Sequence, residues 1–134
     1  MMKRTKSTGI LAGKASEGVC EVNFVDPKRV EEARASLPSE GDLRRAADSF
    51  RVLANPNRLR VLKALQGREL CVCDLREVLG ISMSGTSQVL KELRSLGAVE
   101  FRTKGKLAYY QLADTAWLEL AEHVLGKVRD ELAA

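Results

Sequence analysis

The segment VLGISMSGTSQVLKELRSLGAVEFRTKGKLAYYQL, residues 78–112, contains the pattern that decides the fold. Residues 80–82 form a short link, which begins with glycine, between one amphipathic segment and a second over residues 83–96. Gly97 ends the second segment, and apolar positions then alternate on both sides of residues 104–106. Because a helical period changes to a period of two, the stretch predicts two helices joined by a tight turn and then a β-hairpin. This order is typical of a helix-turn-helix with a wing.

The rest of the chain predicts further helices around this stretch. Asp26 and Asn55 each precede a proline, and such a pair places a capping side chain before a proline in the first helical turn. The further helices are expected at about residues 27–36, 43–54, 56–66, 72–79 and 114–132. The predicted fold class is therefore mainly α with a small β-hairpin. We expect a polar arm over residues 1–26 and a winged helix-turn-helix domain over residues 27–134.

The composition limits the classes of function. The chain carries 22 basic and 18 acidic residues, a net charge of +4, and only 4% aromatic residues. A mild positive charge is compatible with nucleic acid without requiring it, and so few aromatic rings argue against stacking on many bases. No apolar run approaches the roughly 20 residues that cross a bilayer, and the apolar part of the N-terminal segment is too short for a secretion signal. We therefore expect a cytoplasmic protein with reduced thiols and no membrane contact.

Small polar and basic side chains lie where such a fold meets DNA. The second helix of a helix-turn-helix enters the major groove with its first turns nearest the bases, and a basic hairpin tip suits phosphate contact. The candidate DNA-binding residues are Ser84, Thr86, Ser87, Gln88 and Lys91 on the helix and Arg102, Lys104 and Lys106 on the hairpin. Residues 84–106 hold five basic and two acidic residues, a net +3. Each feature alone is also typical of a solvated surface, and their combination favours binding to double-stranded DNA.

Two of the three cysteines, Cys71 and Cys73, stand at the expected start of the helix over residues 72–79. A thiol is a weak hydrogen-bond acceptor and a poor cap, so helix stability does not explain its presence there. Because a capping residue is not yet helical, both side chains can turn toward one point, and the positive end of the helix dipole favours thiolates. The pair is therefore either two soft metal ligands or two small buried apolar side chains, and the pattern leaves both interpretations open.

Cys20 is the third thiol and lies in the polar arm, where no core is expected. Three thiols also suit a redox switch in which Cys71 and Cys73 oxidise with Cys20 as a resolving partner, so a thiol-based redox-sensing regulator is the alternative function. A cysteine hydrolase needs a base beside its nucleophile. The one histidine, His123, lies far along the chain on an amphipathic helix, so we expect no enzyme activity.

The segments described above resemble a known protein family. ELCVCDL, residues 69–75, together with residues 78–112, resembles the ArsR/SmtB family of bacterial metal-sensing repressors, and the likeness extends over about residues 43–132. CEVNFVDPKRV, residues 20–30, resembles the N-terminal segment of the cadmium- and lead-sensing, CadC-like branch. The resemblance implies a homodimeric winged helix whose first and last helices form the dimer interface. It also implies a repressor that binds operator DNA and is released when metal binds.

The resemblance implies a set of metal ligands as well. Cys71 and Cys73 match the cysteines of a short family motif at residues 69–75, hereafter the box. Cys20 matches the first arm cysteine of the cadmium and lead branch, where the arm ligand comes from the opposite subunit. Phe24 and Arg76 stand where branches of the family carry further cysteines. Three thiolates suit cadmium or lead as the effector, with arsenite or mercury as alternatives, whereas tetrahedral zinc would need a fourth ligand.

Overall fold

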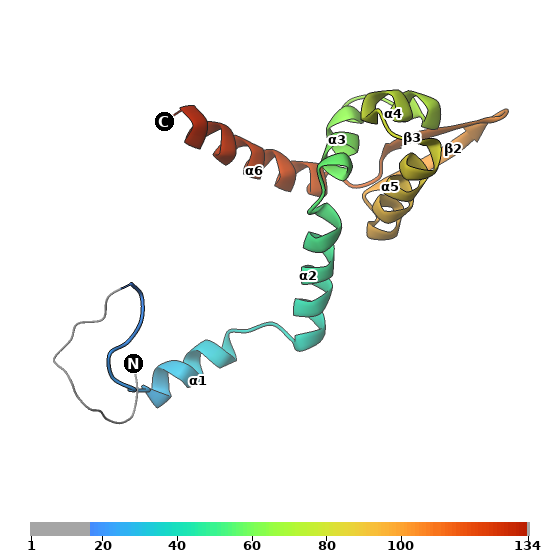
Figure 1. Ribbon diagram of the computed structural model, residues 1–134. Helices are drawn as coiled ribbons and strands as arrows, with labels where there is room; N and C mark the ends of the chain where they lie inside the picture. Colours follow the sequence, from blue (N-terminus) through green and yellow to red (C-terminus); the bar gives the residue numbers. More distant parts are fainter. Residues whose placement is uncertain (1–16, 134) are drawn as a thin grey trace. The chain divides into compact units, whose positions relative to one another are not determined.

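The computed structural model describes residues 17–133 (Figure 1). These residues divide into two units, with the boundary between residues 43 and 44. The two units are described separately below. The boundary between them falls inside a helix, whereas the expected division into an arm and a domain comes after residue 26; that functional division stays a prediction. Within residues 17–133, no helix combines the length with the apolar character that a membrane crossing needs.

The N-terminal unit contains α1 (Pro27–Ala35) and the start of α2 (Glu40–Leu53). The carboxylate of Asp26 caps α1 by accepting hydrogen bonds from the backbone N–H groups of Lys28 and Arg29 at 3.1 and 3.2 Å. The helix therefore begins where the sequence predicts it, and it ends one residue earlier. No residue of α1 is buried, so burial does not stabilise this helix in the single chain.

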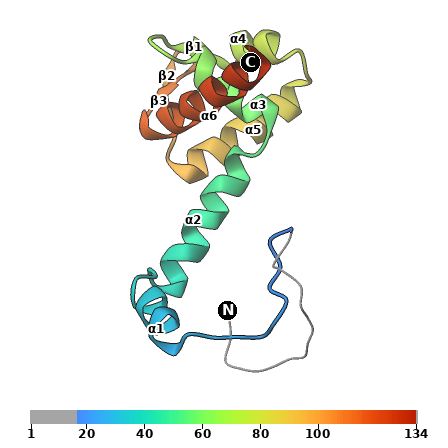
Figure 2. The same ribbon diagram turned by 90° about the vertical axis from the view of Figure 1, so that its left-hand side faces the viewer.

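The core of the C-terminal unit lies among four helices. The helices α3 (Pro56–Ala64), α4 (Val72–Leu79) and α5 (Met83–Leu96) pack against one another, and α6 (Ala116–Ala133) packs against α3 (Figure 2). Asn55 caps α3 as predicted, since its side-chain oxygen accepts two backbone hydrogen bonds. The largest fully buried side chains are Val61, Leu62, Leu65, Leu75, Thr86, Leu90 and Leu93. All except the threonine are apolar, as the amphipathic pattern of the helices predicts.

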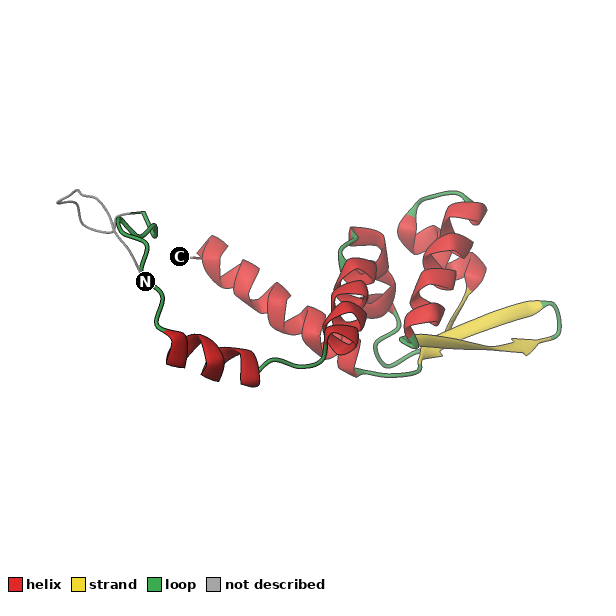
Figure 3. Ribbon diagram, turned by 90° about the horizontal axis from the view of Figure 1, so that it is seen from below, coloured by secondary structure: helices red, strands yellow, loops and turns green. Residues whose placement is uncertain are grey.

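A three-stranded antiparallel sheet completes this unit. Its strands are β1 (Leu70–Cys71), β2 (Val99–Lys104) and β3 (Leu107–Leu112), in the order β1-β3-β2. The β2–β3 hairpin, hereafter the wing, confirms the predicted hairpin and projects from the helices of this unit (Figure 3). Its two-residue turn begins at Gly105, whose φ of +61° suits a glycine. The sequence did not predict β1, because two residues carry no readable period and this strand exists only through its pairing with β3.

Two polar contacts hold α6 in place: a cap at its first residue and an ion pair to α3. The carboxylate of Asp114 accepts the backbone N–H of Ala116 at 2.9 Å, so Asp114 opens the last helix as predicted, although the first helical residue is Ala116. Further along α6, Oε1 of Glu122 lies 2.7 Å from Nζ of Lys63 in α3. This contact with Lys63 lowers the pKa of the Glu122 carboxyl below its ordinary value. The ion pair therefore joins α3 to α6.

Candidate nucleic-acid interface and metal site

A tight turn sets the direction of α5 relative to α4. Gly80 ends α4 with a φ of +66°, and Ser82 caps α5, because its Oγ accepts the backbone N–H of Gly85 at 3.0 Å. A Cβ added to Gly85 would lie 3.1 Å from Oγ of Ser82 and 3.3 Å from Cδ1 of Ile81. A larger residue would therefore crowd the cap, which explains a glycine inside the first turn of the candidate recognition helix.

Four of the predicted DNA-binding residues share the exposed face of α5. Ser84, Ser87, Gln88 and Lys91 are all exposed to solvent. The side-chain amide of Gln88 donates from Nε2 to Oε1 of Glu92 at 3.0 Å, one turn away. The face therefore offers hydrogen-bond donors and acceptors together with one positive charge. These groups suit contacts with base edges and phosphates when such a helix enters a major groove.

Thr86 was predicted to contact DNA, but the structure places it in the core. Its side chain is completely buried, at 0% exposure, and its Oγ1 donates to the carbonyl oxygen of Ser82 at 2.9 Å. A hydroxyl held in this way supports the start of the helix and cannot reach DNA. Met83, the first residue of α5, is 40% exposed although it is apolar. The helical period gives the physical reason: Thr86 precedes Leu90 by four positions and shares its buried face, whatever the polarity of its side chain.

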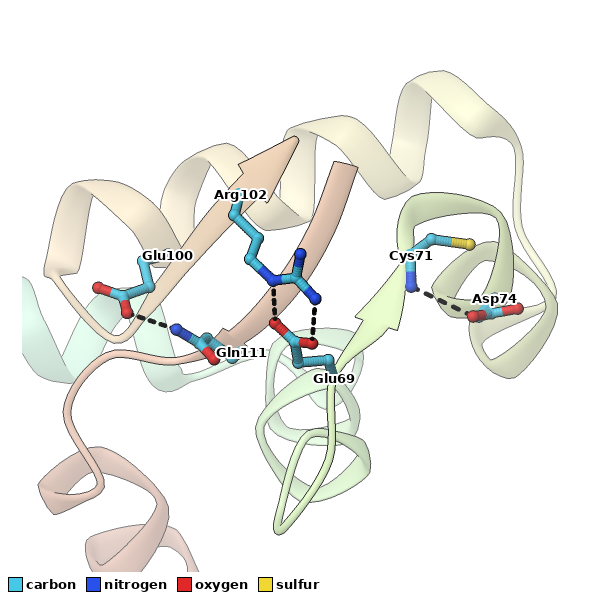
Figure 4. A network of polar contacts seen from close by, with 6 residues as sticks. All are labelled: Glu69, Cys71, Asp74, Glu100, Arg102 and Gln111. Carbon is cyan, nitrogen blue, oxygen red and sulfur yellow. Dashed lines mark hydrogen bonds and ion pairs between the residues drawn. The ribbon is translucent and has the colours of Figure 1, made fainter. Parts of the chain in front are cut away.

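The wing carries three residues predicted to contact phosphates, and one of them, Arg102, is paired with a carboxylate. Lys104 and Lys106 are exposed at its tip. Arg102 is also exposed, but Nε and Nη2 of its guanidinium donate to the carboxylate of Glu69 at 2.9 and 2.8 Å (Figure 4). These hydrogen bonds lower the pKa of Glu69 and raise the pKa of Arg102. The guanidinium also lies over the ring of Tyr109, 5.5 Å from its centre.

Cys71 and Cys73 occupy unlike positions at the start of α4. Cys71 is the capping residue, with an extended backbone (φ −79°, ψ 167°), and it is 8% exposed as the last residue of β1. The carboxylate of Asp74 accepts its backbone N–H at 3.2 Å, as in a capping box (Figure 4). Cys73, in the first helical turn, is exposed. Both interpretations of the pair therefore apply in part, since Cys71 packs like an apolar side chain and Cys73 is open to solvent.

Cys20 belongs to a different unit from Cys71 and Cys73. Cys20 is exposed in the N-terminal unit, and none of the three cysteines is in a disulfide. Among residues 17–133, no group of three or more histidine, cysteine, aspartate or glutamate side chains is placed to hold a metal ion.

An apolar surface on the C-terminal unit is uncovered. Phe50 in α2 is 58% exposed, and Val124 and Val128 in α6 are 53% and 47% exposed. Together with Leu120 they line a hollow of about 370 Å³. We call these four residues the apolar surface. Much of this surface has no covering partner among residues 44–133. Exposed apolar surfaces of this kind mark protein–protein contacts.

Known proteins with similar sequences identify the family. A family model described as "Bacterial regulatory protein, arsR family" matches residues 55–100, from the cap of α3 to the start of the wing. The transcriptional repressor SmtB homolog of Synechocystis sp. is 36% identical over 110 residues, which cover 79% of this chain and 83% of that protein. The chain belongs to the ArsR family. The cadmium resistance transcriptional regulatory protein CadC of Listeria innocua is 33% identical over 105 residues, or 78% of this chain and 87% of that protein.

Solved structures agree with the ArsR-family assignment. The crystal structure of M. tuberculosis Rv0081 is similar with a TM-score of 0.63 and 34% identity, covering 72% of this chain and 100% of that one. Mb0332 from Mycobacterium bovis, a homodimeric winged helix-turn-helix DNA-binding domain, gives a TM-score of 0.62 and 28% identity, covering 72% and 93%. The predicted fold class is confirmed. As an ArsR-family member the chain is a transcriptional repressor and not an enzyme.

Replacing Lys91 with alanine in this ArsR-family protein is expected to flatten the salt dependence of DNA binding. Lys91 is exposed on the candidate face of α5, and each phosphate that a protein neutralises adds about 0.9 to the slope of log K against log salt concentration. The slope should therefore fall by about one unit, with little change in sequence preference. Fluorescence anisotropy with labelled operator over a series of salt concentrations measures this slope. Lys127→Ala removes the same charge from α6 and is the control; an unchanged slope for Lys91→Ala would show that this side chain misses the phosphates.

Proposed function

We propose that the protein represses its operator as a homodimer and is released when a thiophilic metal ion binds to Cys20, Cys71 and Cys73. The observation that carries the proposal is the position of the two box cysteines. They stand at the cap and in the first turn of α4, where a serine or threonine would serve the helix better. Cys71 also ends β1, which is paired with the wing, so its ligation affects an element joined to the DNA-binding part of the fold.

The two box cysteines differ in their access to solvent. Both lie at the N-terminal end of α4, where the helix dipole carries a partial positive charge. Cys73 is exposed and so can meet an ion from solvent, whereas Cys71 lies at the edge of the core. Two sulfurs of this kind supply soft ligands and leave coordination positions for a third donor.

Cys20 supplies the third sulfur in this proposal, from the arm of the opposite subunit. Its participation is supported by the resemblance of residues 20–30 to the CadC-like N-terminal segment and by the exposure of the Cys20 thiol. A three-sulfur site suits cadmium or lead, and arsenite or mercury are the other candidates, while zinc would need an added oxygen ligand.

The DNA-binding side of the proposal uses the exposed face of α5 and the wing. In a homodimer that buries the apolar surface, two copies of α5 would meet half-sites about one DNA turn, roughly 34 Å, apart. The proposed contacts are Ser84, Ser87, Gln88 and Lys91 on α5 and Arg102, Lys104 and Lys106 on the wing, without the buried Thr86. The serine and glutamine side chains suit base edges, and the basic side chains suit phosphates.

A metal titration of the operator-bound dimer tests the proposal directly. Cadmium, lead, mercury, arsenite and zinc are added separately, and both operator affinity and the ultraviolet absorbance of thiolate–metal bonds are followed. We expect cadmium or lead to bind stoichiometrically and to weaken operator binding by about 5- to 150-fold, the usual range of allosteric coupling. Release by peroxide in the absence of metal would instead support the redox-sensing alternative. Stoichiometric binding of every ion without any loss of operator affinity would contradict the proposal.

A further inference from the structure

A single ion pair connects the wing with the residue that precedes β1. Glu69 and Arg102 are 33 positions apart in the sequence, and their side chains make two parallel hydrogen bonds, from Nε to Oε2 at 2.9 Å and from Nη2 to Oε1 at 2.8 Å. Such a two-point pair defines the direction of a guanidinium as well as its position. Figure 4 shows the carboxylate facing the guanidinium across the sheet, with Gln111 and Glu100 forming a separate contact beside it.

The same sheet brings Arg102 into line with a box cysteine. Cys71 is paired with Tyr109 across β1 and β3, and Tyr109 is paired with Arg102 across β3 and β2. One row of the sheet therefore runs from Cys71 to Arg102, and the Arg102 guanidinium covers the Tyr109 ring within that row. Glu69 stands two residues before Cys71 on the same short segment. The box and the wing are thus joined twice, by the backbone ladder and by the Glu69–Arg102 pair.

We propose that Glu69 is a positioning residue that couples the box cysteines to the wing: its carboxylate orients Arg102 toward a DNA phosphate, and metal binding at Cys71 disturbs this orientation. This inference rests on the proposed function. Glu69 engages the Nε and Nη2 edge of the guanidinium, and a guanidinium has five N–H donors. The Nη1 edge can therefore meet a phosphate while Glu69 holds the other edge. Without Glu69, the long side chain would sample many rotamers and lose this direction.

The shortness of β1 explains why the pair would carry the coupling. β1 has two residues, and Cys71 is both its last residue and the cap of α4. An ion bound to the Cys71 sulfur constrains this residue directly, so a change there reaches Glu69 within two positions of chain. From Glu69 the change passes to Arg102 through two charge-assisted hydrogen bonds. Arg102 is 53% exposed and Glu69 is 32% exposed, so the pair lies at the surface, where it can form and break.

The substitution Glu69→Gln tests the coupling in the full-length dimer. Glutamine keeps the size of the side chain, but it removes the charge and one of the two acceptors that Arg102 uses. We expect stoichiometric cadmium binding, seen in thiolate–metal absorbance, to be unchanged. Metal-free operator binding should weaken by a few-fold, because Arg102 loses its direction toward the phosphate. The fold-change in operator dissociation constant that cadmium causes should fall by roughly threefold or more, because one exposed pair contributes coupling of this order. By reciprocity, operator should also weaken cadmium binding less in the variant than in the wild type.

A matched control and a double-mutant cycle separate coupling from a structural effect. Glu100→Gln removes a carboxylate from the same sheet, one that accepts from Gln111 at 2.7 Å, and it should leave the cadmium response unchanged. Arg102→Gln and the double variant should lose no more coupling than Glu69→Gln alone, since either change removes the whole pair. A Glu69→Gln protein that responds to cadmium as fully as the wild type overturns the inference. A wild-type protein that does not respond overturns the proposed function instead, so the two failures are distinguishable.

Discussion

Serine in place of Cys71 or Cys73 is expected to abolish the release of operator by cadmium or lead while leaving operator binding within about twofold of the wild type. The reason lies in the difference between the two side chains. Serine has nearly the shape of cysteine but binds soft ions poorly, and it is a better helix cap than cysteine. At Cys71, the cap of α4, the substitution should therefore keep or slightly raise the thermal unfolding temperature. The same substitution should therefore remove the response to metal without lowering the stability of the helix.

The measurement compares operator dissociation constants with and without one equivalent of cadmium per site. Wild type should lose about 5- to 150-fold in affinity, and each serine variant should show a ratio near one. Val78→Ser, which places serine at an exposed position on the same helix, controls for the substitution itself and should respond as the wild type does. Cys20→Ser should weaken ion binding and reduce the thiolate–metal absorbance. A Cys73→Ser protein that still releases operator fully would contradict the proposed ligand set.

Glutamate in place of Val124 is expected to prevent dimerisation and to lower operator affinity by about 100-fold or more. Val124 is 53% exposed on the apolar surface, and in a symmetric dimer the substitution occurs on both sides of the contact. Burying unpaired carboxylates costs several kcal/mol, and each 1.4 kcal/mol is about tenfold in an equilibrium constant. A monomer would engage one half-site at a time and so lose the combined binding of two recognition helices.

Sedimentation velocity at a fixed protein concentration measures the oligomeric state, and anisotropy measures operator binding. His123→Glu is the matched control, because it introduces the same charge one position earlier on α6, at an exposed residue outside the apolar surface. This control should remain dimeric and bind operator within a few-fold of the wild type. A Val124→Glu protein that sediments as a dimer and binds operator normally would show that another surface joins the subunits.

Local signals in the sequence account for the helices and the hairpin. Asp26 and Asn55 start helices because their side chains accept hydrogen bonds from backbone groups two and three residues later. Gly80 and Gly97 end helices because both adopt positive φ. These interactions lie within a few residues of chain, so residue types alone reveal them. The predicted boundaries of α4 and α5 agree with the structure for the same reason.

Other features depend on residues that meet only after the chain has folded. The strand β1 forms because its two residues pair with β3, and Arg102 binds the carboxylate of Glu69, 33 positions away. No local pattern in the sequence predicts either contact. Thr86 is buried because the helical period places it over the core, although its hydroxyl alone suggests a surface position. Residue types and spacing thus determined the helix-turn-helix, the wing and the cysteine positions. Long-range packing decided which of these side chains are exposed, which are paired and which are buried. Burial depends on neighbours that are distant in the sequence and come close only in the complete fold.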